Sequence, residues 1–249
     1  MGSQGRGQAG NCRRMAMAVT LSEVRRRVAQ VHQGADLEQQ LRFYDAWAAE
    51  YDEDVSVLEY GAPRFAAACL AAAFGDDPQE ALVLDVACGT GRVAQELHTA
   101  GFRHFHGLDG SPGMLELARR KDLYQDLKQC LLGQEGLPSP EGCYDAVVIV
   151  GALSEGQVPV NVVPELLRVA KPGGFVCMTT RNNRSSLPYK TILEKVLADL
   201  EQKGLWEKMA AEGIERWERA TSEEESGPGL EYISGVVYLY RKKGRTSIP

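Results

Sequence analysis

Short apolar runs alternate with amphipathic segments through the middle of the chain. Apolar runs of this length, bounded by turn residues, are typical of strands buried on both faces of a parallel sheet. Ser111 followed by Pro112 is a typical helix start. The predicted strands are residues 81–86, 105–108, 130–132, 146–150 and 175–180, and the predicted helices are residues 91–97, 112 onward and 163–170. Strands separated by helices predict a doubly wound α/β fold with right-handed crossovers.

The two ends of the chain have different patterns. Residues 1–20 are rich in glycine and lack an apolar period, which predicts a flexible tail. Residues 21–58 repeat apolar side chains at helical spacing, and Pro63 opens a second helix. The predicted C-terminal elements are a helix over residues 187–203 and a hairpin of residues 214–220 and 232–240.

Composition limits the classes of protein that fit the sequence. The 249 residues are 44% hydrophobic and 25% charged, which suits one globular α/β domain with a tail. The formal net charge of −6 argues against a protein that grips nucleic acid over its whole surface. No apolar run approaches the roughly 20 residues that span a bilayer, so no membrane association is expected.

Cysteine and histidine usage predicts no metal site. The six cysteines are scattered and form no paired motif, which suits a reducing compartment. His104 and His106 alternate along a strand without a third ligand, so we interpret them as strand-face residues. A cytoplasmic location is expected, with the nucleus and the mitochondrion as alternatives. The mitochondrion stays open because the start of the chain is rich in arginine and poor in acids.

The segment over residues 82–94 carries the chemical signal. A buried strand ends at Asp85, and a turn with Gly89 and Gly91 leads into a helix. Glycines here let a ligand approach the backbone, and Asp109 after the next strand fits an acid that binds ribose hydroxyls. A dinucleotide is disfavoured because Asp85 would lie beside its pyrophosphate. The acid at this position favours a cationic nucleoside without phosphate, S-adenosylmethionine.

Five sequence segments and one predicted helix, in a fixed order, agree with this choice of cofactor. The segments are Leu-Asp-Val-Ala-Cys-Gly-Thr-Gly (84–91), Gly-Leu-Asp-Gly-Ser-Pro-Gly-Met-Leu (107–115), Gly-Gln-Glu-Gly-Leu-Pro (133–138), Tyr-Asp-Ala-Val-Val (144–148) and Lys-Pro-Gly-Gly (171–174), and the helix is residues 43–52. Together they resemble the motifs of class I S-adenosylmethionine-dependent methyltransferases. The resemblance implies a Rossmann-like seven-stranded sheet with an antiparallel last strand and an N-terminal helical lid.

The resemblance also implies how the chain is divided. Residues 21–249 would form a single methyltransferase domain. Its parts would be N-terminal helices (21–75), a cofactor-binding core (80–180), and C-terminal helices with a strand hairpin (181–249).

The family's site residues map onto this chain one by one. Asp85, Ala87, Gly89 and Gly91 would hold the methionine part of the cofactor, which would cover Cys88; Asp109 would accept both ribose hydroxyls; Gly110 and Met114 would flank the adenine, and Gln134 and Glu135 would reach its edge; Val150 and Gly151 would lie under the sulfonium; Tyr44 and Tyr51 would close over the cofactor; and Arg64 would pair with its carboxylate. Plain packing is the alternative for Met114, Tyr44 and Tyr51, and a solvated surface is the alternative for Arg64.

The sequence defines the acceptor side less closely. The mouth is expected from residues 43–51, 153–157 and 181–186. Its candidate residues are Trp47, Ser154, Glu155, Arg181 and Asn182, and no general base stands out. The aromatic-proline motif of nucleic-acid amino methyltransferases is missing after the fourth strand, which argues against a nucleic-acid acceptor.

The predicted function is methyl transfer from S-adenosylmethionine, with S-adenosylhomocysteine as product, to a small molecule or a protein. The reaction would be an in-line displacement at carbon. The alternatives are a protein that binds S-adenosylmethionine without transferase activity, and an NAD-dependent oxidoreductase. The acceptor atom and the oligomeric state are left open by the sequence.

Overall fold

The computed structural model describes residues 19–31, 37–75, 77–222, 225, 227 and 229–244. The predicted tail over residues 1–20 lies almost wholly outside these ranges. The helices are α1 (Leu21–Val31), α2 (Leu37–Val57), α3 (Ala62–Phe74), α4 (Arg92–Thr99), α5 (Pro112–Arg120), α6 (Val163–Val169) and α7 (Leu187–Gln202), with short 3-10 turns at η1 (Val160–Val162) and η2 (Arg184–Ser186). The strands are β1 (Leu82–Val86), β2 (His104–Asp109), β3 (Tyr124–Gln129), β4 (Tyr144–Ile149), β5 (Ala170–Arg181), β6 (Trp206–Arg219) and β7 (Tyr232–Lys242). Within these ranges, no helix is both long and apolar enough to cross a bilayer.

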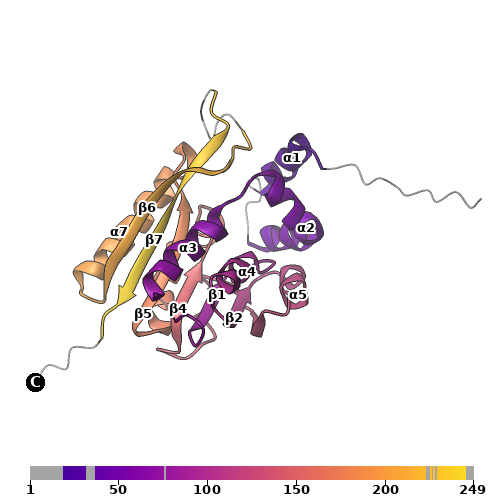
Figure 1. Ribbon diagram of the computed structural model, residues 1–249. Coiled ribbons are helices and arrows are strands. Elements are labelled where there is room, and N and C mark those ends of the chain that lie inside the picture. Colours follow the sequence, from indigo (N-terminus) through magenta and orange to yellow (C-terminus); the bar gives the residue numbers. More distant parts are fainter. Residues whose placement is uncertain are drawn as a thin grey trace, which may run out of the picture.

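The strands form one seven-stranded sheet in the order β3-β2-β1-β4-β5-β7-β6 (Figure 1). Strands β1 to β5 pair in parallel, whereas β7 runs antiparallel to both β5 and β6. The predicted doubly wound, Rossmann-like sheet with an antiparallel last strand is therefore confirmed. The strand order reverses between β1 and β4, and ligands of such sheets bind in the crevice at this point.

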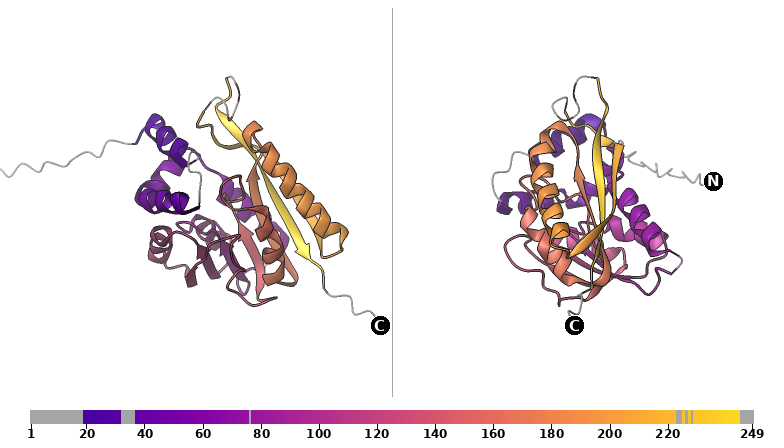
Figure 2. Two further views of the ribbon diagram at one scale, coloured as in Figure 1. Left: turned by 180° about the vertical axis from the view of Figure 1, so that it is seen from behind. Right: turned by 90° about the vertical axis from the view of Figure 1, so that its left-hand side faces the viewer.

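The side chains of β1 point alternately to the two faces of the sheet. Leu84 and Val86 pack in an apolar cluster with residues of α6 and α7, whereas Val83 packs with residues of α3 and α4. Figure 2 shows α7 along the hairpin of β6 and β7, on the side of the molecule away from α1 and α2. Because side chains alternate along a strand, Asp85 shares the face of Val83 and is enclosed beneath the α3 and α4 layer.

Two predicted strands have different limits in the structure. β3 precedes the predicted residues 130–132, and β6 begins at Trp206, earlier than the predicted residue 214. Both are edge strands of the sheet, where polar side chains face solvent and break the apolar run. The predicted helix start at Ser111 is confirmed, because its hydroxyl accepts a hydrogen bond from the amide of Met114 at 3.1 Å.

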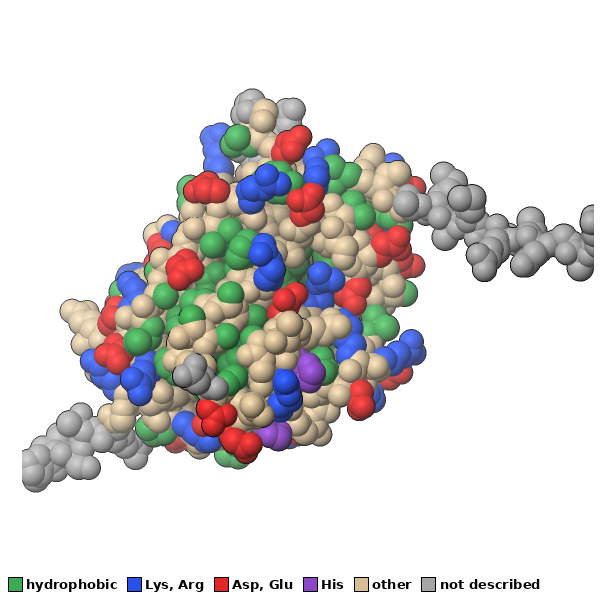
Figure 3. All heavy atoms as spheres, viewed as in Figure 1, with side chains coloured by type: hydrophobic (Ala, Val, Ile, Leu, Met, Phe, Trp, Pro, Cys, Tyr) green, Lys and Arg blue, Asp and Glu red, His purple; other side chains and the backbone are tan. Residues whose placement is uncertain are grey.

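Charges of both signs are mixed over the face of the molecule in Figure 3. Among the described residues on that face, lysines and arginines form no continuous basic stripe. A stripe of that kind is the usual electrostatic footprint of nucleic-acid binding. This face therefore gives no support to a nucleic-acid partner.

Gly235 on β7 is required by close packing. A Cβ atom there would overlap the indole of Trp217, which is 1% exposed and stacks on Phe65 at 5.9 Å between ring centroids. We expect Gly235→Ala to lower the free energy of unfolding by about 1–3 kcal/mol, as overpacking of a core does. Urea unfolding followed by circular dichroism measures the change.

The matched control is Gly213→Ala on β6, where an added Cβ would meet no atom within 4 Å. This variant should keep the stability of the wild type or gain up to about 1 kcal/mol, because glycine weakens a strand interior. Equal stability of the Gly235→Ala variant and the wild type would contradict the packing described for Trp217.

Candidate functional site

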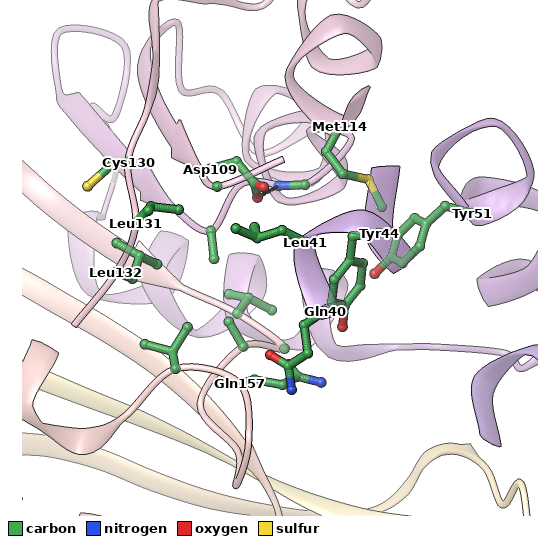
Figure 4. Close-up of a pocket in the computed structure, with 17 residues that line it drawn as sticks. Gln40, Leu41, Tyr44, Tyr51, Asp109, Met114, Cys130, Leu131, Leu132 and Gln157 are labelled. Carbon is green, nitrogen blue, oxygen red and sulfur yellow. Dashed lines mark hydrogen bonds between the residues drawn. The ribbon is translucent and has the colours of Figure 1, made fainter. Parts of the chain in front are cut away.

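A cavity opens at the carboxyl ends of β1, β2 and β4, beneath α2 (Figure 4). Its empty space is about 770 Å³, counting the part open to solvent. Tyr44 and Tyr51 lie across it from Leu131 and Leu132. Among the described residues that line the cavity, none is lysine, arginine or histidine. Asp109 is therefore the one charged residue of this described lining, which is otherwise apolar apart from two glutamines and two tyrosines.

The turn after β1 brings backbone to the cavity. Ala87, Gly89 and Gly91 all have positive φ, at 55°, 55° and 86°. The amide of Gly91 donates to the carbonyl of Cys88 at 2.9 Å and closes the turn. A Cβ atom on Gly89 would meet nothing within 4 Å, whereas one on Gly91 would come within 3.0 Å of the Tyr124 ring. Gly89 thus presents bare backbone to open space, and Gly91 lets the turn pack on Tyr124.

Asp109 ends β2 with its carboxylate in the cavity wall (Figure 4). Its Oδ2 accepts a hydrogen bond from the amide of Gly89 at 2.8 Å, and its Oδ1 accepts one from the amide of Ser111 at 2.9 Å. Burial raises the pKa of Asp109, and the amide hydrogen bonds oppose that rise. The carboxylate is therefore held in one orientation, and each oxygen keeps a lone pair for a ligand hydroxyl.

Asp85 is the second acid at this edge of the sheet, and it is 0% exposed. The hydroxyl of Tyr124 donates to its Oδ2 at 2.7 Å, whereas Oδ1 has no hydrogen-bond partner among the described residues. The pKa of Asp85 is raised to about 7, chiefly by burial; the hydrogen bond from Tyr124 opposes the rise, and the charge of Asp109 adds to it. A buried carboxyl with one unsatisfied oxygen indicates a group that a ligand completes.

Acidic residues of α2 fasten this helix to the neighbouring elements. The hydroxyl of Thr90 donates to Asp52 at 2.7 Å, and Lys121 Nζ lies 2.9 Å from the other oxygen of Asp52. The amide of Gly113, at the start of α5, donates to Asp45 at 2.9 Å. These contacts join α2 to the glycine turn and to α5, so that the helix roofs the cavity.

Tyr44 and Tyr51 belong to an aromatic row on α2. The ring of Trp47 lies between them, with centroids 6.0 Å from Tyr44 and 4.8 Å from Tyr51. Burial raises the pKa of Tyr44 to about 12 and also raises the pKa of Tyr51. Both phenols are therefore neutral at physiological pH and able to donate hydrogen bonds.

Comparison with known proteins decides the family. Residues 83–174 match the family model described as a methyltransferase domain. The chain is 58% identical to methyltransferase-like protein 27 of Homo sapiens over 197 residues, which are 79% of this chain and 80% of the human protein. The chain belongs to the class I S-adenosylmethionine-dependent methyltransferases. It is an enzyme of the transferase class.

More distant relatives share the fold of this methyltransferase. A demethylmenaquinone methyltransferase of Renibacterium salmoninarum is 31% identical over 154 residues, or 62% of this chain and 63% of that protein. A chain of the complex between the Haloferax volcanii Trm112 methyltransferase activator and its methyltransferase superposes with a TM-score of 0.60 at 16% identity, over 81% of this chain and 96% of that one. A TehB-like S-adenosylmethionine-dependent methyltransferase from Corynebacterium glutamicum gives a TM-score of 0.53 at 18% identity, over 80% and 99%.

The structure brings most of the predicted cofactor residues of the methyltransferase to one cavity. Its lining includes Tyr44, Tyr51, Ala87, Gly89, Asp109, Gly110, Met114, Val150 and Gly151. Asp85, Cys88 and Gly91 belong to the same strand end and turn but are buried outside the lining. The contacts of these residues with a cofactor stay predictions.

Three predicted residues do not reach the cavity. Arg64 is exposed on α3, where its guanidinium lies 4.6 Å from the centroid of the Phe65 ring. Gln134 and Glu135 are also exposed, and Gln134 lines a separate outer groove. At this part of the chain the cavity is instead lined by the apolar residues 130–132, which follow β3.

The lining also includes residues that sequence reasoning missed. They are Gln40, Leu41, Cys130, Leu131, Leu132, Ala152 and Val158. Gln40 and Leu41 lie one helical turn before Tyr44, so helical spacing was an available signal. Residues 130–132 follow β3 and lie at the same sheet edge as Asp109. The sequence analysis placed them inside the strand, so it did not predict that they line the cavity.

A second cavity lies beside the first, and we call it the aromatic chamber. Tyr44, Trp47, Tyr51, Tyr60 and Trp217 are its aromatic lining residues, and Arg181 and Glu218 are its charged ones. Of the residues predicted for the mouth, Trp47, Ser154 and Arg181 line this chamber. Glu155 lines the outer groove and Asn182 a surface pocket.

The raised pKa of Asp85 gives stability a distinct pH dependence. Because its folded pKa, about 7, exceeds the 3.8 of an unperturbed aspartate, the folded state holds the proton more tightly. The free energy of unfolding should therefore fall as pH rises from about 4 to about 7. Asp85→Asn cannot ionise, so its stability relative to the wild type should grow by roughly 2–3 kcal/mol between about pH 5 and pH 7.

Urea unfolding of both proteins at the two pH values measures this difference. The control is Asp126→Asn on β3, which removes a carboxylate paired with Lys128 at 2.8 Å outside the cavity. Parallel stability curves for Asp85→Asn and the wild type would show that Asp85 is not buried as described.

Proposed function

We propose that the cavity under α2 binds S-adenosylmethionine and that the enzyme transfers its methyl group to a small molecule. The supporting observation is the pair of carboxyl groups at the ends of β1 and β2: Asp109 lines the cavity, Asp85 is buried at the adjacent strand end, and the described lining has no basic side chain. A sulfonium nucleoside carries positive charge and no phosphate, so it matches this environment.

The residues present fit the cofactor at three places. Oδ1 of Asp85 is buried without a hydrogen-bond partner in the described chain, as expected for a group that awaits a cationic ligand. Gly89 presents bare backbone toward open space. Asp109 is oriented by two amides and keeps lone pairs for the ribose hydroxyls.

The remaining contacts follow from the lining. Gly110 and Met114 belong to the start of α5, next to Asp109, and would flank the adenine together with Leu131 and Leu132. Val150 and Gly151 would lie under the sulfonium at the end of β4. This arrangement directs the methyl group toward the aromatic chamber, because Gly151 lines both cavities.

The cofactor and the protein have different roles in methyl transfer. When bound, S-adenosylmethionine supplies an electrophilic methyl group whose leaving group is a neutral thioether. No acid has to protonate that leaving group, so the protein's part is to orient the acceptor and to exclude water. Tyr44 and Tyr51 exclude water by roofing the cavity, and Asp52 holds α2 in place.

A dinucleotide is disfavoured by the same residues. Its pyrophosphate would lie at the glycine turn, between the carboxyls of Asp85 and Asp109, and no lysine or arginine of the described lining would compensate it. The oxidoreductase alternative is therefore not favoured.

Replacing Asp109 tests the proposed binding mode. Asp109→Ala should weaken the binding of S-adenosylmethionine and S-adenosylhomocysteine by about 1–3 kcal/mol, because a charged acceptor of the ribose hydroxyls is lost. Isothermal titration calorimetry measures both affinities.

The control, Asp126→Ala, removes a carboxylate that lies outside the cavity and should leave both affinities unchanged. Unchanged affinity in the Asp109→Ala protein would remove Asp109 from the site. Heat with NADH and none with S-adenosylmethionine would revive the dinucleotide alternative.

A further inference from the structure

The aromatic chamber is placed to receive the methyl acceptor. It shares Tyr44, Tyr51, Gly151 and Gln157 with the cofactor cavity, so the two spaces meet at the end of β4. Gly151 has a φ of +76°, and a side chain there would overlap the hydroxyl of Tyr60. Glycine at this position therefore makes room for the Tyr60 hydroxyl beside the junction of the two spaces.

The composition of the chamber walls indicates the kind of molecule that fits. Its empty space is about 640 Å³, counting the part open to solvent. Its walls come from α1, α2, the ends of β4 and β5, and β6. The chamber therefore has walls from the N-terminal helices, the central sheet and the C-terminal hairpin.

Aromatic rings dominate these walls. Trp47 is 7% exposed and Trp217 is 1% exposed, so each packs against the protein on most of its surface. Tyr44, Tyr51 and Tyr60 complete the aromatic lining. The faces of tryptophan and tyrosine rings carry negative potential and attract organic cations in dry sites.

The charged residues of the chamber favour the same class of ligand. Glu218 is 4% exposed, and its Oε1 lies 2.8 Å from Nε of Arg181. A second carboxylate, that of Glu225, lies 3.4 Å from Nη1 of Arg181. The guanidinium charge is thus already matched by carboxylates of this chain, so Arg181 is a poor receptor for an anionic acceptor. Two carboxylates against one guanidinium leave a net negative charge here, and Glu218 lines the chamber.

We infer that the acceptor is a small hydrophobic amine, bound as its ammonium ion in the aromatic chamber between the rings and Glu218. The inference rests on the proposed function, because it assigns the acceptor of that same reaction. An aromatic or branched alkyl group would fill the apolar part of the chamber, and the nitrogen would face the junction at Gly151.

The chemistry balances with Glu218 as the proton acceptor. The bound ammonium ion gives one proton to the Glu218 carboxylate, which frees the nitrogen lone pair. The lone pair attacks the methyl carbon, the carbon–sulfur bond breaks, and its electron pair stays on sulfur. The products are the methylated ammonium ion, the neutral thioether and one proton, which Glu218 returns to water. Burial raises the pKa of Glu218, which suits a base that must take a proton from nitrogen.

A matched set of ligands tests the charge that the chamber recognises. Phenethylamine, phenethyl alcohol and hydrocinnamate have the same phenyl-ethyl skeleton and carry a positive, a neutral and a negative group. Two of the three tryptophans, Trp47 and Trp217, line the chamber, whereas Trp206 is buried against Tyr240 at 4.3 Å between ring centroids. Tryptophan fluorescence therefore reports binding in both the free and the S-adenosylhomocysteine-saturated protein.

We expect phenethylamine to bind roughly tenfold or more tightly than phenethyl alcohol, and hydrocinnamate to bind weakest. With S-adenosylmethionine present, only the amine should yield a methylated product by mass spectrometry. Equal affinity for amine and alcohol, tighter binding of the acid, or no binding of the amine would each overturn the inference. A failure of the proposed function is distinct, because S-adenosylhomocysteine would then give no heat in calorimetry.

Variants locate the effect in the chamber. Glu218→Gln should weaken phenethylamine binding roughly tenfold while leaving the affinity for S-adenosylhomocysteine unchanged. Glu59→Gln is the matched control, since it removes a carboxylate that pairs with Arg219 outside the chamber. Unchanged amine binding in a folded Glu218→Gln protein would overturn the role of Glu218, and the wild-type ligand series tests the inference even where that variant does not fold.

Discussion

Two carboxyl groups lie at the ends of adjacent strands with no cation of the described chain beside either. Asp109 is stabilised by the amides of Gly89 and Ser111, and Asp85 by one phenol hydroxyl from Tyr124. Burying a carboxylate costs free energy unless hydrogen bonds or a cation compensate it, and Asp85 leaves one oxygen without either. In the proposed function, a cationic nucleoside would supply the missing charge and complete an arrangement that folding leaves open.

Helix α2 connects this arrangement to the acceptor side. Tyr44 and Tyr51 line both the cofactor cavity and the aromatic chamber, and Asp52 holds the helix to Thr90 of the glycine turn. In the proposed function, the same helix would cover the bound cofactor and form one wall of the acceptor space. One structural element would then both exclude water and orient the acceptor, which are the protein's tasks when the leaving group needs no acid.

The sequence predicts the glycine turn and the two acids well because they belong to a local pattern. Strand, acid, glycine turn and helix lie within one short segment, and the parallel topology then brings Asp109 to the same edge. Residues placed by longer-range packing were harder to predict. Glu218 reaches the chamber from β6, far along the chain, and its segment reads as a solvent-exposed edge strand. Gln134 and Glu135 show the opposite case, since their segment matches the family motif but lies in an exposed turn away from the cavity.

A crystal structure of the complex with S-adenosylhomocysteine tests the central claim most directly. The account predicts both ribose hydroxyls within about 3 Å of the Asp109 carboxylate and the nucleoside enclosed under Tyr44 and Tyr51. It also predicts that the sulfur faces the aromatic chamber across Gly151. A nucleoside bound elsewhere, or an Asp109 carboxylate turned away from the ribose, would contradict the account.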